Sequence, residues 1–133
     1  MSSGRNGHVE NQKKREELIG ILEELSDRKI QIDLWINHKD YPNFSGIDQV
    51  YHFLFDDTDL GCNAENEIGF IIENKEEAFL INELCILLSE INGRLGDRDS
   101  LSYINDEKWK NIIKFSNKIL NKMRDLDLSH DEY

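Results

Sequence analysis

Proline, cysteine and long apolar runs are scarce in this 133-residue sequence, and each shortage excludes something. With one proline, Pro42, and 38% hydrophobic residues, the chain is too apolar to be disordered, so it should fold. Its two cysteines, Cys62 and Cys85, do not form a CxxC motif for zinc or redox chemistry. No apolar run approaches the roughly 20 residues that span a bilayer, and the N-terminus lacks a signal-peptide stretch. We therefore expect a cytoplasmic protein that does not bind membranes.

Basic residues are also few, with 16 Lys and Arg against 27 Asp and Glu, a net charge of −11. This charge opposes nucleic acids and anionic membranes and favours a basic partner. The acidity is local, because residues 47–77 contain one basic and nine acidic residues and carry −8. Lysines repeat every four residues from Lys110 to Lys122, but we interpret them as a solvated helix face and expect no nucleic-acid binding.

The length fits one domain. We predict a mobile leader at 1–8, a single helical domain at 9–125 and an acidic tail at 126–133. The fold class is mainly α, a compact single-domain bundle of about four to five helices. One short strand pair is the alternative for two ambiguous segments.

Three segments have a clear helical spacing of apolar residues. The first, 9–27, is amphipathic. The second begins after a possible cap at Asn74, is apolar around most of its circumference, and should end near Gly93 or Gly96. The third covers 106–124. These three helices should supply most of the core.

Other segments are less clear. The alternation in 30–36 is typical of a strand, but Trp35 makes the second face apolar too, so we favour a short helix. A turn should occupy 37–46, and 47–55 is predicted as a helix with a strand as the alternative. The run 68–72 is too short to separate a strand from a buried helix.

The polar residues from Asp56 to Glu67 predict a long, solvent-facing acidic loop, because so many adjacent carboxylates are costly to desolvate together. Its carboxylates are oriented, in our hypothesis, toward a partner protein. The predicted partner-binding residues are Asp56, Asp57, Asp59, Glu65, Glu67 and Glu73.

No catalytic apparatus is recognisable, so we expect no enzyme activity, no cofactor and no metal. A calcium loop that starts at Asp56 fails because Leu60 takes a ligand position. His52 and Asp56 lie four residues apart and would share a helix face, close to Asp57. A metal-dependent enzyme built on these three residues is the less favoured alternative.

A set of motifs within residues 14 to 124 comprises Trp35-Ile36, Tyr41-Pro42, Asp48, His52-Phe53-Leu54-Phe55-Asp56-Asp57-Thr58 and Ile68-Gly69. These motifs resemble a family of small bacterial proteins without an assigned biochemical activity. In size and acidity the chain is also similar to the immunity proteins of contact-dependent inhibition and other polymorphic toxin systems. That similarity implies a class of function and no individual residue.

The leading hypothesis is therefore an antitoxin-like immunity protein. It would bind a cognate basic toxin, such as a ribonuclease, and occlude its active site with the acids of the 56–73 region. A small regulatory adaptor that binds an endogenous protein is the alternative that sequence does not separate from it.

Overall fold

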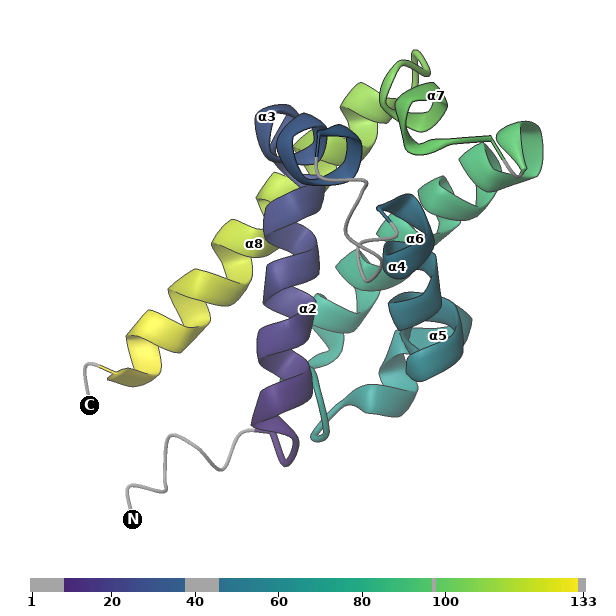
Figure 1. The fold of residues 1–133 in the computed structure, drawn as a ribbon. Helices are drawn as coiled ribbons and strands as arrows, with labels where there is room; N and C mark the ends of the chain where they lie inside the picture. Colours follow the sequence, from purple (N-terminus) through teal and green to yellow (C-terminus); the bar gives the residue numbers. More distant parts are fainter. Residues whose placement is uncertain (1–8, 38–45, 97, 132–133) are drawn as a thin grey trace.

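The structure is a computed structural model that describes residues 9–37, 46–96 and 98–131, with side chains as far as Arg124 (Figure 1). The predicted leader at 1–8 lies outside the described residues, as do most of the predicted turn at 37–46 and the last two residues of the predicted tail.

Helices make up most of the described residues, which confirms the mainly α prediction. The α-helices are α2 (Gln12–Leu25), α3 (Arg28–Gln31), α4 (Ile47–Tyr51), α5 (Leu60–Asn63), α6 (Lys75–Leu95), α7 (Ser100–Ile104) and α8 (Trp109–Asp131). Two π-helical segments, η1 (Ile32–Ile36) and η2 (His52–Asp57), and one 3₁₀ segment, η3 (Ala64–Glu67), complete the helical elements. The predicted number of four to five helices is too low, because short helices occupy segments expected to be loops.

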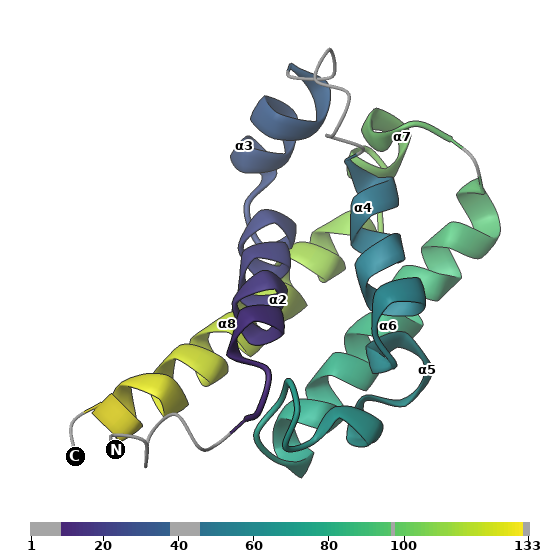
Figure 2. The ribbon, with the colours of Figure 1, turned by 60° about the horizontal axis from the view of Figure 1, so that its bottom comes forward.

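Three long helices form the frame of the molecule. α8 packs along both α2 and α6 (Figure 1), whereas α5 packs against α6 on the side away from α8, with α4 beside it (Figure 2). α3 and α7 lie at one end of this frame (Figure 1). The fully buried side chains of the shared core include Leu18, Leu22 and Leu25 of α2, Ile81, Leu84 and Leu88 of α6, and Trp109 of α8.

Side-chain and glycine caps set the ends of the long helices. Asn11 Oδ1 accepts the N–H of Lys14 at 3.0 Å at the start of α2. Asn74 Oδ1 accepts the N–H of Glu77 at 2.9 Å, which confirms the predicted cap of α6. The same helix ends at Gly96, one of the two predicted endpoints, whose φ of 58° lies in the left-handed region that glycine enters readily.

The segment 30–36 is helical, as favoured over a strand, and forms the end of α3 and all of η1. Trp35 is buried, donates from Nε1 to Glu24 Oε1 at 3.0 Å and meets the Trp109 ring edge-on at 6.2 Å. Ile32, in contrast, is exposed. The alternating pattern was misleading because these apolar residues do not share one buried face.

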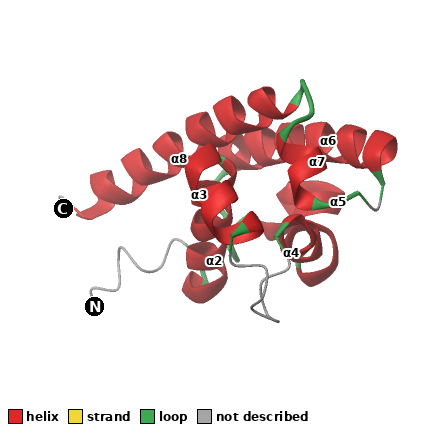
Figure 3. Cartoon of the chain, turned by 45° about the horizontal axis from the view of Figure 1, so that its top comes forward, coloured by secondary structure: helices red, strands yellow, loops and turns green. Residues whose placement is uncertain are grey.

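The alternative of a short strand pair is wrong for the part of the chain that the structure describes, which contains no strand (Figure 3). The segment 68–72 is instead a tight turn with one isolated bridge between Ile68 and Ile72. The N–H groups of residues 70, 71 and 72 donate to the Glu67 carbonyl at 3.0, 2.9 and 3.2 Å. Gly69 enables this turn with a φ of 90°.

The long acidic loop predicted from Asp56 to Glu67 is also wrong, because η2, α5 and η3 occupy most of it. Leu60 and Ala64 are fully buried, four residues apart, and fix α5 against α6. Thr58 Oγ1 donates to the Phe53 carbonyl at 3.0 Å and accepts the N–H of Leu60 at 3.2 Å. The sequence argument considered only carboxylates and overlooked these intervening residues.

The last helix differs from its predicted range of 106–124 at both ends. It begins at Trp109, because Asp106 forms a turn before it, accepting the N–H of Trp109 at 2.9 Å through its carbonyl. Two hydrogen bonds from Arg94, of 2.8 and 2.9 Å, lower the pKa of Asp106. α8 then continues through Asp131, so it includes most of the predicted tail at 126–133, which contains no proline or glycine to end a helix.

Candidate partner-binding face

The six predicted partner-binding acids divide into two groups. Four are exposed: Asp56 and Asp57 in η2, Asp59 just before α5, and Glu65 in η3. Glu67 and Glu73 have largely buried side chains and bind backbone or side-chain partners within the protein. The structure therefore supports a surface role for the first four residues only.

Glu67 connects the two ends of the segment formed by residues 59–72, which we call the acidic segment. Its Oε2 accepts the N–H of Asp59 at 2.8 Å, and its carbonyl accepts the three N–H groups of the turn that follows. Both ends of the 59–72 segment are thus tied to one residue. Glu67 therefore has a structural role within the protein.

Glu73 lies beside a buried ion pair that sequence analysis missed. Arg15 Nη1 and Nη2 donate to the two carboxylate oxygens of Glu77 at 3.1 and 2.9 Å, and Glu73 Oε2 lies 3.8 Å from Nη2. Arg15 also donates to the Ile71 carbonyl at 3.0 Å. These contacts join the starts of α2 and α6 to the turn between η3 and α6.

A sequence signal for this pair existed. Arg15 lies three residues before Leu18, and Glu77 four residues before Ile81, so each charge falls on an apolar helical stripe. A charge at such a position is buried when the stripe is buried, and it then needs a partner of opposite sign. Only the tertiary structure identifies which partner each one meets.

The exposed acids of η2 interact with two basic side chains. Lys14 Nζ donates to Asp57 Oδ2 at 3.1 Å, and this hydrogen bond raises the pKa of Lys14. The same Nζ lies 5.4 Å from the centre of the Phe53 ring. His52 Nδ1 lies 3.2 Å from Asp56 Oδ2, and its Nε2 lies 3.9 Å from Asp57 Oδ1. The sequence-predicted proximity of His52, Asp56 and Asp57 is therefore present, on the surface.

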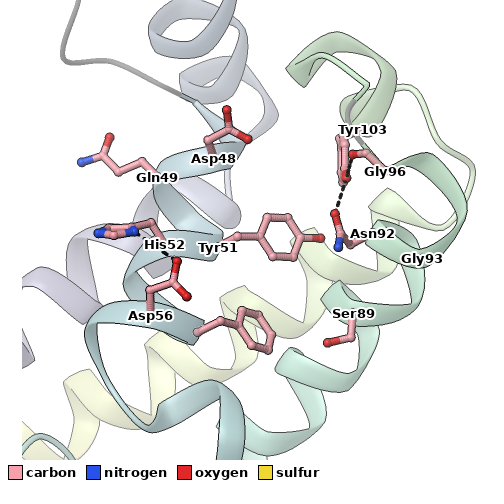
Figure 4. Close-up of a pocket in the computed structure, with 11 residues that line it drawn as sticks. Asp48, Gln49, Tyr51, His52, Asp56, Ser89, Asn92, Gly93, Gly96 and Tyr103 are labelled. Carbon is pink, nitrogen blue, oxygen red and sulfur yellow. Dashed lines mark hydrogen bonds and ion pairs between the residues drawn. The ribbon is translucent and has the colours of Figure 1, made fainter.

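A groove of about 770 Å³ lies between α4 and η2 on one side and α6 and α7 on the other (Figure 4). Asp48 and Asp56 supply carboxylates to its lining. Tyr51 extends across it toward α6 (Figure 4), and Phe55 also lines it. The remaining lining residues are Gln49, His52, Ser89, Asn92, Gly93, Gly96 and Tyr103.

Hydrogen bonds fix the aromatic floor of this groove. The Tyr51 hydroxyl donates to the Leu88 carbonyl at 2.6 Å, and burial raises its pKa. The Tyr103 hydroxyl donates to the Gly96 carbonyl at 2.6 Å and lies 2.8 Å from Asn92 Oδ1. These hydrogen bonds hold both rings in place, so the groove is preformed in the protein alone.

A second hollow, of about 650 Å³, follows α6 beside α5 and shares Ser89 with the groove. Glu83 and Glu90 line it, seven residues apart on one side of α6. Phe79 and Ile86 line it too, and are 61% and 52% exposed. Among the described residues, no Lys or Arg lines either hollow. We call the two hollows together the acidic face.

The positive charges gather elsewhere. Residues 109–124 of α8 contain five Lys and Arg and no acid. Of these, Lys110, Lys114 and Lys118 are exposed, while Lys122 pairs with Glu76 at 2.6 Å. α4 and α5 lie on the far side of α6 from α8 (Figure 2), so most of the acidic face and the helix that carries these lysines are on different sides of α6.

Within the described residues, no three or more His, Cys, Asp and Glu side chains form a group suited to hold a metal ion. None of the described helices has the length and apolar character needed to cross a bilayer. Neither finding names a partner or a reaction.

Comparison with known proteins identifies a family. The model of a family described as a domain of unknown function (DUF7945) matches residues 9–131. The search of curated proteins and the search of solved structures returned no match. The matched range covers nearly the whole chain, and the chain belongs to this family.

Proposed function

We propose that this protein is an antitoxin-like immunity protein that binds a cognate basic toxin, such as a ribonuclease, and blocks its active site. The observation that carries the proposal is the acidic face. Its two hollows are lined by Asp48, Asp56, Glu83 and Glu90, with no Lys or Arg from the part of the chain that the structure describes, beside exposed Phe79 and Ile86.

This combination suits protein binding. Carboxylates of one sign speed the approach of a basic partner and reject acidic ones. Exposed aromatic and aliphatic side chains supply the buried contacts that give most of the affinity. A toxin that binds a nucleic-acid phosphate backbone has a basic cleft, which an acidic surface complements and covers. The inhibitor would act in the cytoplasm, where such a substrate is found.

The partner-contacting acids in this proposal are Asp56, Asp57, Asp59 and Glu65, joined by those that line the two hollows. Glu67 and Glu73 act indirectly, because they hold the acidic segment in shape. The proposal therefore keeps four of the six residues selected from the sequence.

The test is to mix the purified protein with the product of the neighbouring gene. We expect a stoichiometric complex by size-exclusion chromatography and calorimetry, together with loss of the partner's toxic activity. No binding at micromolar concentrations would overturn the proposal.

A charge-reversal pair identifies the surface. Asp56→Lys combined with Asp59→Lys should weaken the complex by about tenfold or more, because two attractive charges become repulsive. The matched control is Glu16→Lys. Glu16 is exposed on α2 and lies seven residues before Glu23, so the two share a face of that helix. Glu23 pairs with Arg124 of α8, so this face is on the α8 side of the molecule, away from the acidic face.

A further inference from the structure

We infer that the groove between α4, η2, α6 and α7 receives an arginine side chain of the partner. The inference rests on the proposed function and names the chemistry of the contact. It is argued from the charge, the aromatic surface and the open wall of the groove.

The charge of the groove favours a cation. Its lining includes Asp48 and Asp56 and, among the described residues, no Lys or Arg that would compete for them. The C-terminal end of α6 reaches the same groove at Gly93 and Gly96. This end of a 21-residue helix is the negative end of its macrodipole. The two carboxylates and the end of α6 all make the electrostatic potential of the groove more negative.

The aromatic surface favours arginine over lysine. Tyr51 and Phe55 stack with 22° between their planes and 5.8 Å between their centres, and the Tyr103 ring meets Tyr51 edge-on at 6.0 Å. A planar guanidinium stacks on such rings and offers five N–H donors in a fixed fork. Asn92 Oδ1 and the Asp56 carboxylate supply acceptors in the groove lining.

Two glycines keep the groove wall open. A Cβ atom placed on Gly93 or Gly96 would meet no other atom within 4 Å. Gly93 lies inside α6 and does not have a positive φ, so a larger residue fits its backbone. A side chain there would occupy the space that we assign to the guanidinium.

The test is an NMR titration of the ¹⁵N-labelled protein with the acetylated, amidated peptide Gly-Arg-Gly-Arg-Gly. The matched probe replaces each arginine by citrulline, which keeps the shape and removes the charge. With the arginine peptide, we expect saturable chemical-shift changes of the Gly93 and Gly96 amides. The citrulline peptide should bind at least about tenfold more weakly than the arginine peptide. Equal binding of the two peptides, or shifts confined to Asp59 and Glu65, would overturn the inference.

A matched pair of variants tests the location. Gly93→Leu fills the groove wall, whereas Gly20→Leu adds the same side chain to α2, where a Cβ also meets no atom within 4 Å. Both should keep or raise the melting temperature, because leucine favours helix more than glycine. Only Gly93→Leu should lose the arginine peptide. Similar affinity of the two variants for the peptide would contradict the assignment.

The toxin assay separates the two proposals. If the partner binds wild type and Gly93→Leu equally well, the immunity function stands and the arginine inference falls. If the arginine peptide occupies the groove but the neighbouring gene product does not bind, the groove assignment stands and the proposed function falls.

Discussion

The carboxylates between residues 56 and 77 fall into an exposed group and a buried group. Asp56, Asp57, Asp59 and Glu65 remain in water, whereas Glu67, Glu73 and Glu77 are buried or nearly so and have partners inside the protein. Both groups occur within about twenty residues of sequence, so density of charge does not separate them. The difference is the kind of donor: Glu67 and Glu77 accept hydrogen bonds from a backbone N–H and a buried guanidinium, which compensate desolvation. The side chains that pair with Asp56 and Asp57 are themselves in contact with water.

The largest expected effect is at the buried ion pair. Glu77→Gln removes the carboxylate that forms the close ion pair with the buried Arg15 guanidinium, while Glu73 lies 3.8 Å away. It should lower the free energy of unfolding by about 3–5 kcal/mol. Urea denaturation measures this loss. Glu65→Gln is the matched control, because Glu65 is exposed, and should change stability by less than about 0.5 kcal/mol.

A double variant sharpens that prediction. Replacing both partners, as Arg15→Met with Glu77→Leu, should recover much of the lost stability, because neither charge of this pair is left buried without the other. If the double variant is as unstable as Glu77→Gln, the cost comes from packing rather than from charge.

A smaller effect is expected at Glu67. Glu67→Ala removes the acceptor of the Asp59 N–H and should lower the free energy of unfolding by about 1–2 kcal/mol. The measurement is again urea denaturation, with Glu65→Ala as its partner variant. Equal stability of the two would show that Glu67 belongs with the exposed acids.

The buried thiol of Cys85 should make the stability of the protein depend on pH in the alkaline range. Burial raises the pKa of Cys85 from its ordinary 9.0 to about 12. The folded state therefore favours the neutral thiol. Its contribution is complete below pH about 9 and is lost as the pH rises toward 12, because the unfolded chain ionises first.

We expect unfolding free energies measured between pH 8 and 11 to decline less steeply for Cys85→Ala than for wild type. In the native protein a thiol reagent should label the exposed Cys62 at once, and Cys85 only after unfolding. Equal labelling rates would contradict the buried position of Cys85.

The smallest effect on stability is expected at the exposed acids. Asp59→Asn and Glu65→Gln should each change the free energy of unfolding by less than about 0.5 kcal/mol. They should instead slow association with the basic partner, an effect that stopped-flow measurements detect and that added salt reduces. An unchanged rate would place the contact surface elsewhere.

Local patterns were sufficient to predict the long helices. The apolar stripes follow from the spacing within one helix, as for Leu18 and Leu22 in α2 and Ile81 and Leu84 in α6. The Asn74 cap and the Gly96 end of α6 are local in the same way. The exposed Asp56 and Asp57 were also selected correctly as surface residues. Each of these features is determined by residues a few positions apart.

The features missed depend on distant residues. Arg15 and Glu77 are 62 positions apart, and the hydrogen bond from Tyr51 to Leu88 spans 37. The groove itself requires α7 to bring Tyr103 beside Tyr51, which no local spacing indicates. The inward position of Glu73 beside Arg15 is another contact of this kind, whereas Glu67 turns inward to the N–H of Asp59, only eight positions away.

With most of the acidic face and the lysines of α8 on different sides of α6, a basic partner would attract one side of the molecule and repel the other. Such a partner would exert a torque on the molecule and begin to rotate the acidic face forward before contact. At physiological ionic strength this torque acts within about 8 Å, so it selects orientations in the last stage of approach. The lysines of α8 would then face away from the bound partner.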